Sequence, residues 1–303
     1  MIEVQGLTKD YGSKRAVDNV TFTVQPGRVT GFLGPNGAGK STTMRMIMGL
    51  DTPSSGTATV GGKRLAQHAA PLGVAAALLE AKGVHKSRSA RNHLRVIAAT
   101  HGISTKRVDE VIELTGLGSV ARKRVGGFSL GMGQRLGIAA ALLGDPQTLI
   151  LDEPVNGLDP EGVLWVRNLS RHLASEGRTV FLSSHLMSEM AQTAHHLIVI
   201  GRGRILADAS IEDVLASTEE QVSLVRTDDV EALLRTLAAD GVRCTVTAPN
   251  TLEVLGLPPR EIAAAALEAR ILIYELTPRS SSLEDAYMEL TKAEVEYVSG
   301  GIA

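Results

Sequence analysis

The feature that most constrains this sequence is a glycine-rich run placed between an apolar segment and a helical one. Residues 34–41 read Gly-Pro-Asn-Gly-Ala-Gly-Lys-Ser and fit the pattern Gly, any four residues, Gly, Lys, Ser or Thr. Residues 29–33 have the composition of a buried strand, and residues 41–50 carry apolar side chains at helical spacing. An accidental glycine-rich turn would not need this strand-to-helix context, so we interpret the run as a phosphate-binding loop.

The pattern suits a nucleotide bound together with Mg²⁺. Its glycines let the backbone curl so that N–H groups point at phosphate oxygens, and the following helix presents its positive N-terminal end to the same anion. Lys40 can reach the terminal phosphates, and the Ser41 hydroxyl can bind the metal ion. The residues expected to contact the nucleotide are Gly34, Pro35, Asn36, Gly37, Ala38, Gly39, Lys40, Ser41 and Thr42.

Two adjacent carboxylates follow a second apolar strand. Residues 148–151, Thr-Leu-Ile-Leu, lead directly into Asp152 and Glu153. At the carboxyl end of a strand Asp152 is placed to hold Mg²⁺, and Glu153 is placed to orient or deprotonate an attacking water. The alternative is that the two acids merely begin a turn, and a turn follows under either interpretation. A kinase that transfers phosphate to a hydroxyl would not need a water-activating carboxylate here, so the pair favours hydrolysis.

A third segment lies between these two motifs. Residues 128–135 read Phe-Ser-Leu-Gly-Met-Gly-Gln-Arg and lead into an Ala- and Leu-rich helix. The segment resembles the Leu-Ser-Gly-Gly-Gln signature of ATP-binding cassette proteins, with Ser129 and Gly131 matching and Met132 in place of the glutamine. A serine at a helix start can be only an N-cap, but the order of the three motifs carries the resemblance. It implies that ATP is the nucleotide, and that Ser129, Gly131 and Met132 cap the ATP of a second copy in a homodimer.

Further positions follow the order of the same family. Residues 157–159, Gly-Leu-Asp, resemble the loop through which the two ATP sites of a dimer communicate, and Asp159 belongs to it. His185 follows a further apolar strand and resembles the histidine that contacts the γ-phosphate. Tyr11 resembles the aromatic residue that stacks on adenine, and Val17 is expected to line the same base site. The alternatives are a structural histidine and an ordinary edge-strand tyrosine, but the order along the chain favours the active site.

One position departs from the family pattern. Members carry a glutamine that binds Mg²⁺ in a loop before the helical insertion, and counting back from residues 91–94 places Glu80 there. A carboxylate is a competent ligand for this hard cation. The expected metal ligands are therefore Ser41, Asp152 and Glu80, and the expected catalytic residues are Lys40, Glu153 and His185.

The alternation of strand-like and helical segments along the chain predicts its domain organisation. Short apolar strands alternate with turns and helical patterns up to about residue 210, which predicts an α/β fold around a mainly parallel sheet. With the resemblance, residues 1–215 are expected to be a P-loop NTPase domain, with an antiparallel β subdomain and a helical insertion at about 85–145. A small α+β domain is expected at 220–293, followed by a tail at 294–303. Strands are predicted at 29–33, 148–151, 179–182, 222–225 and 244–246, and a hairpin at 197–200 and 204–207.

Composition narrows the choice of partners. The formal net charge of −2 gives no global basic field, so we expect no nucleic acid partner. A single cysteine, Cys244, allows neither an internal disulfide nor a cysteine metal cluster. The N-terminus is polar rather than signal-like, and no apolar run approaches the roughly 20 residues that span a bilayer. If the protein acts at a membrane, another chain must hold it there.

These features together predict the ATP-hydrolysing subunit of a bacterial transporter. The resemblance implies a separate integral membrane permease and a location in the cytoplasm, peripheral on the inner face of the membrane. Residues 276–279 and 282–291 resemble the end of the drug-exporter branch of the daunorubicin-resistance type, which implies export of drugs or other small hydrophobic compounds. Two alternatives stay open: a soluble cassette protein acting on ribosomes or nucleic acid, and a regulatory or immunity role in which ATP binding matters more than turnover.

Overall fold

A computed structural model describes residues 1–79, 84–216, 222–239, 241–279 and 283–291 of the 303-residue chain. These residues fold into two compact units. The first contains Met1–Ile211 with the end of the last helix, and the second contains Glu212–Glu289. Each unit has a hydrophobic core of its own.

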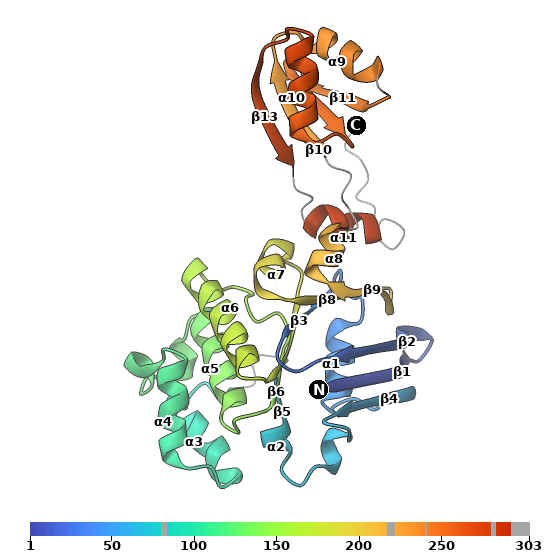
Figure 1. The fold of residues 1–303 in the computed structure, drawn as a ribbon. Coiled ribbons are helices and arrows are strands. Elements are labelled where there is room, and N and C mark those ends of the chain that lie inside the picture. The colour runs from blue at the N-terminus through green and yellow to red at the C-terminus, as the bar shows by residue number, and fades with distance from the viewer. Residues whose placement is uncertain (80–83, 217–221, 240, 280–282, 292–303) are drawn as a thin grey trace. The chain divides into compact units, whose positions relative to one another are not determined.

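A six-stranded sheet forms the centre of the first unit (Figure 1). Its first five strands pair in parallel and the last pair is antiparallel, which confirms the predicted α/β fold and the predicted hairpin. All residues of three of these strands, β3, β6 and β7, are buried, as is typical of parallel strands covered on both faces. In sheet order the strands are β5 (Ala75–Leu78), β6 (Thr148–Leu151), β7 (Thr179–Ser184), β3 (Val29–Leu33), β8 (His196–Gly201) and β9 (Arg204–Ser210).

A smaller antiparallel sheet shares the core with the central one. Its strands run in the order β2 (Lys14–Val24), β1 (Ile2–Tyr11) and β4 (Ser55–Val60). The rings of Phe22, Phe32 and Phe181 join the two sheets, with centroids 5.2–5.9 Å apart. Helix α1 (Lys40–Ile47) adds Met44 to the same core. The helix that follows the phosphate-binding loop is thus anchored between both sheets.

Helices form a layer beside β5 and β6, at the left of Figure 1. Helices α3 (Ala90–Thr100), α4 (Thr105–Leu114) and α5 (Leu130–Leu142) fall within the predicted helical insertion. Each begins after a serine whose hydroxyl accepts a hydrogen bond from a backbone N–H of the first turn, which satisfies a donor that the helix itself leaves free. The remaining helices of this unit are α2 (Pro71–Val74), α6 (Pro160–Ser175) and α7 (Met187–Thr193), with 3₁₀ turns at Leu65–Gln67, Gly118–Val120 and Val125–Gly127.

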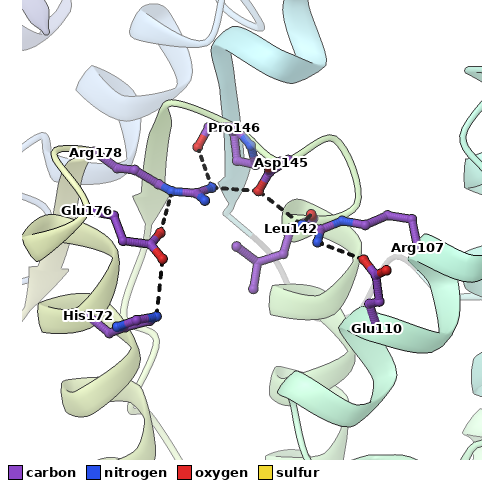
Figure 2. Close-up of polar contacts among 8 residues, drawn as sticks. All are labelled: Arg107, Glu110, Leu142, Asp145, Pro146, His172, Glu176 and Arg178. Carbon is purple, nitrogen blue, oxygen red and sulfur yellow. Dashed lines mark hydrogen bonds and ion pairs between the residues drawn. The ribbon is translucent and has the colours of Figure 1, made fainter.

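A network of ion pairs ties this helical layer to the central sheet (Figure 2). Asp145, in the turn between α5 and β6, accepts hydrogen bonds from Arg107 of α4 at 3.1 Å and from Arg178, just before β7, at 2.7 Å. Arg107 also donates to the carbonyl of Leu142 at the end of α5. Arg178 also pairs with Glu176 at 3.0 Å. Asp145 therefore links three elements that are distant in the sequence.

The second unit has the strand and helix order βαββαβ. Four antiparallel strands lie in the order β11 (Arg243–Ala248), β12 (Thr251–Leu255), β10 (Val222–Thr227) and β13 (Ile273–Arg279), a ferredoxin-like arrangement. Helices α9 (Val230–Ala239) and α10 (Pro259–Glu268) share a core with the sheet through Leu233, Leu237 and Ile262. Helices α8 (Ile211–Ala216) and α11 (Leu283–Thr291) lie before and after it in the sequence. The small α+β fold predicted for this part of the chain is confirmed; the expected tail at 294–303 lies outside the described residues.

The Asp145 network should make stability depend on pH in a defined way. Hydrogen bonding to Arg178 lowers the pKa of Asp145 below its ordinary value of 3.8, so its contribution is present above that pH and is lost as pH falls through the lower folded-state value. Asp145 has a positive φ, which Asn tolerates. We expect Asp145→Asn to lower the melting temperature by about 1–3 °C at pH 7, because the carboxylate is largely exposed.

The measurement is calorimetric melting of both proteins between pH 7 and pH 3. The gap between the wild-type protein and the variant should begin to narrow below about pH 3.8 and should continue to narrow as the pH falls towards the lower folded-state pKa of Asp145. A gap that stays constant or widens at low pH would contradict the role of the ionised carboxylate.

Candidate functional site

The phosphate-binding loop lies where β3 gives way to α1. At Gly34 a side chain has no room, because an added Cβ would lie 2.4 Å from the carbonyl oxygen of Ile200. Gly39 has a φ of 106° and an added Cβ would lie 2.6 Å from the carbonyl oxygen of Ala16. Both positions require glycine, so the loop backbone runs against β8 and β2 with nothing in between.

Lys40, the first residue of α1, folds back into this loop. Its side chain is buried, and the ammonium donates to the carbonyl oxygens of Gly34 at 2.6 Å and Pro35 at 3.3 Å. Burial lowers the pKa of Lys40, and the carboxylates of Glu153 and Asp152 oppose this shift. The ammonium lies 3.8 Å from Glu153 Oε1. The structure therefore brings together two of the predicted catalytic residues.

Glu153 stands at the carboxyl end of β6 with its backbone held from two sides. Its N–H donates to Ser183 Oγ at 2.9 Å, and its carbonyl accepts from Gln134 Nε2 at 3.2 Å. Its φ is 48°, a region that costs energy for a residue with a Cβ and is kept only where the surroundings enforce it. Ser183 also donates to Asp152 Oδ1 at 2.5 Å. One serine of β7 thus holds the side chain of Asp152 and the backbone of Glu153.

His185 completes the group. It follows β7, is partly exposed, and has Nδ1 2.7 Å from Glu153 Oε2. The two carboxylate oxygens of Glu153 therefore face two different nitrogen groups, the Lys40 ammonium and the His185 ring. This arrangement places a carboxylate between two nitrogen groups that an incoming phosphate would attract.

A pocket of about 370 Å³ opens beside the loop. Tyr11, at the end of β1, lines it and is half exposed. Val17 is fully buried beneath Gly39 and is not among the residues that line this pocket, whereas Ala16 is; contact of Val17 with the base stays a prediction. Successive side chains of a strand point to opposite faces, so only one of the two neighbours can face the pocket. The lining residues are Tyr11, Lys14, Ala16, Pro35, Asn36, Gly37, Gly39, Lys40, Ser41, Thr42 and Glu153.

Ser129, Gly131, Met132 and Asp159 do not line this pocket. Ser129 caps α5 by accepting from the N–H of Met132 at 3.2 Å, and Asp159 caps α6 by accepting from the N–H of Gly162 at 2.9 Å. The two segments touch: an added Cβ at Gly157 would lie 2.1 Å from the Leu130 side chain. They form one surface, to which both helices present their N-terminal ends.

Of the predicted metal ligands, Ser41 and Asp152 lie within the described residues. Glu80 lies outside the described residues. Among the residues that the structure describes, no group of three or more His, Cys, Asp or Glu side chains gathers to enclose a metal ion. Mg²⁺ usually keeps several waters and binds through one or two protein ligands together with substrate phosphates. The Ser41 hydroxyl and the Asp152 carboxylate are two oxygen ligands of the kind that Mg²⁺ binds in this way.

Two residues with clear geometric roles carried no assigned role in the sequence. Gln134 lies in the signature-like segment, and Ser183 follows the apolar part of β7. The signal for Ser183 is a polar residue at the carboxyl end of a parallel strand, where site residues gather. The sequence gives no comparable signal for Gln134, because its contact with Glu153 depends on how α5 packs.

Comparison with known proteins gives consistent results. The family model described as ABC transporter matches residues 17–156, and a domain of unknown function, DUF8746, matches residues 221–284. The bacitracin transport ATP-binding protein BcrA of Bacillus licheniformis is 40% identical, over 77% of this chain and 78% of its own length. The Nod factor export ATP-binding protein I of Cupriavidus metallidurans is 35% identical, over 97% of this chain and 98% of its own length.

Solved structures show the same fold. An ATP-binding subunit of an ABC transporter is 28% identical and superposes with a TM-score of 0.65, over 72% of this chain and 92% of its own. A dimeric ATP-binding cassette bound to ADP and phosphate has a TM-score of 0.63 at 20% identity, over 70% of this chain and 99% of its own. The second likeness concerns the fold alone.

Ser183→Ala tests the two hydrogen bonds that hold the Asp152 carboxylate and the Glu153 backbone. We expect ATP turnover to fall about 10- to 100-fold, with more Mg²⁺ needed for half-maximal rate, because groups that orient metal ligands typically have effects of this size. Steady-state rates measured across a Mg²⁺ titration check this. The matched control is Ser184→Ala, since Ser184 is also buried in β7 but accepts from the N–H of Leu186 instead. Equal losses in both variants would show that Ser183 matters only for packing.

Proposed function

Because this chain belongs to the family of ABC transporter ATP-binding proteins, whose members hydrolyse ATP, we propose that it is the motor subunit of a bacterial exporter. The observation that carries the proposal is Glu153, held at the carboxyl end of β6 between Lys40 and His185. A carboxylate in this place serves hydrolysis, where water must be activated, rather than transfer to another hydroxyl. The names of the relatives support export, since they refer to bacitracin transport, lantibiotic transport and Nod factor export.

The chemistry follows from the geometry of these residues. The γ-phosphate of ATP competes with Glu153 for the Lys40 ammonium and the His185 ring. Lys40 then leaves the loop carbonyls and binds phosphate oxygens, and His185 contacts the γ-phosphate. The Glu153 carboxylate is then free to orient water and accept its proton. Ser41 and Asp152 would hold Mg²⁺, which when bound neutralises charge on the phosphates. Ser183 keeps Asp152 in place.

A second copy of the chain is proposed to complete the site. Ser129, Gly131, Met132 and Asp159 lie on a surface apart from the pocket that contains Lys40. The N-terminal ends of α5 and α6 meet at that surface, and such ends attract anions. In a face-to-face homodimer this surface would cap the ATP bound to the other copy. Closure with ATP and opening after hydrolysis would supply the mechanical stroke.

The membrane half of the exporter is proposed to be a separate integral permease. No helix among the described residues is long and apolar enough to cross a bilayer. The chain would therefore sit in the cytoplasm against the inner face of the membrane, held there by the permease. We propose drugs or other small hydrophobic compounds as cargo. The alternative, action on ribosomes or nucleic acid without a membrane, has no support among these relatives.

Glu153→Gln tests the proposed base directly. The amide keeps the shape of the side chain but cannot take a proton, so hydrolysis should fall by about 100-fold or more. ATP binding should be retained or strengthened, because the phosphates no longer compete with a carboxylate for Lys40 and His185. We expect the variant to accumulate as a dimer with ATP in size-exclusion chromatography. Glu261→Gln, an exposed position on α10, is the control. Undiminished turnover in Glu153→Gln would show that Glu153 is not the base.

The transporter assignment is tested by gentle purification of the chain from its native cells. Co-purification with a polytopic membrane protein that alters the ATPase rate is the expected result. Recovery only from the cytosol, with ribosomes or nucleic acid, would leave the ATPase intact and overturn the exporter.

A further inference from the structure

We propose that Asp51 and Arg45 clamp Tyr11 to the phosphate-binding helix α1, and that this clamp sets the affinity for the base of the nucleotide independently of its phosphates. The inference rests on the proposed function, in which ATP occupies the pocket beside Tyr11. Asp51 and Arg45 are positioning residues in this scheme, because they act through the tyrosine and line no part of the pocket.

The clamp consists of three side chains in contact. The Tyr11 hydroxyl donates to Asp51 Oδ2 at 3.1 Å. Arg45 donates hydrogen bonds to both oxygens of the Asp51 carboxylate. Its Nε donates to Oδ2 at 2.9 Å, and its Nη2 donates to Oδ1 at 3.1 Å. A two-pronged pairing of guanidinium and carboxylate fixes orientation as well as distance. The tyrosine ring is therefore directed by a carboxylate that cannot rotate freely.

The far end of the clamp is α1 itself. Arg45 lies in the last turn of α1, and Lys40 and Ser41 lie in its first. The turn that carries Asp51 folds back onto the helix, because the N–H of Leu50 donates to the carbonyl of Arg45 at 2.9 Å. One short helix thus carries the phosphate-binding residues at one end and the anchor of the tyrosine at the other. Base and phosphate subsites are held in register by a single rigid body.

Lys9 restricts the ring further. Its ammonium lies 5.0 Å from the centroid of the Tyr11 ring and donates to the carbonyl of Thr52 at 2.6 Å. A cation within about 6 Å of a ring is attracted to its face. A base that stacks on Tyr11 must then use the face that Lys9 leaves open, and Tyr11 lines the 370 Å³ pocket beside the loop.

Stability alone gives little reason for this arrangement. Tyr11 is half exposed and the Arg45 side chain is 45% exposed, and exposed ion pairs contribute little to folding. The hydrogen bond from Tyr11 and the pairing with Arg45 both favour the ionised form, and the pKa of Asp51 is lowered, Arg45 being the largest cause. A charged, well-oriented acceptor for the hydroxyl of Tyr11 is what positioning of the tyrosine requires.

The test compares two ligands that share phosphates and differ in the base. Binding of ATP and of inorganic tripolyphosphate, each with Mg²⁺, is measured by calorimetry on the wild-type chain, Asp51→Ala and Tyr11→Phe. Both variants should bind ATP about three- to tenfold more weakly, the effect of losing one hydrogen bond. Tripolyphosphate affinity should not change, and the double variant should lose no more ATP affinity than either single one. KM for ATP should rise by the same factor while kcat stays constant.

Asp10→Ala is the matched control, since Asp10 is adjacent to Tyr11 and pairs with Arg15 at 2.8 Å outside the clamp. It should leave both affinities unchanged. Equal losses for ATP and tripolyphosphate in Asp51→Ala would overturn the inference, because Asp51 would then support the loop rather than the base. Unchanged ATP affinity in both Asp51→Ala and Tyr11→Phe would overturn it as well. A wild-type chain that binds neither ligand would overturn the proposed function and this inference with it.

Discussion

The placement of Glu153 is the constraint on which the rest of the site depends. Strands β6 and β7 are parallel neighbours, so their carboxyl ends lie at the same edge of the sheet. Because of this placement, Ser183 contacts the backbone of Glu153 and the side chain of Asp152. The positive φ of Glu153 is enforced by that bond and by Gln134 from the helical layer. Sheet, helical layer and loop all contribute to the position of one carboxylate, so its geometry depends on the fold as a whole.

Much of this architecture could be predicted because the signals are local. The strand at Thr148–Leu151 is apolar throughout and ends in two acids, and the glycine-rich loop follows Val29–Leu33. Each pattern contains its own structural context, so the α/β fold and the meeting of Lys40 with Glu153 followed from order and spacing. The N-caps Ser129 and Asp159 are equally local, and each begins its helix. Their contact with a second chain is not a local property and stays a proposal.

The features that sequence reasoning missed depend on register and on distant contacts. Whether Ala16 or Val17 faces the pocket is decided by the pairing of β1 with β2, whose register shifts between Lys9, which pairs with Val17, and Asp10, which pairs with Arg15. A shift of one residue exchanges the two faces of a strand, so composition cannot settle the choice. Strand β13 contains Ile273, Tyr274 and Thr277, which favour strands, but also Pro278, which is tolerated because β13 lies at the edge of its sheet and pairs only with β10. The strand order of the second unit is non-local in the same way.

The contact between Gly157 and Leu130 has a consequence for communication. Glu153 and Gly157 lie in two overlapping turns. The first is closed by the N–H of Asn156 on the carbonyl of Glu153 at 3.2 Å, and the second by the N–H of Leu158 on the carbonyl of Val155 at 3.1 Å. With no side chain at Gly157, Leu130 packs directly on the second turn, so the start of α5 and this turn are in contact. In the proposed dimer, the hydrolytic half of one site and the capping half of the other would therefore be joined by this contact. In a proposed pair of such chains, each site would sense the state of the other through protein alone, although the two nucleotides never touch.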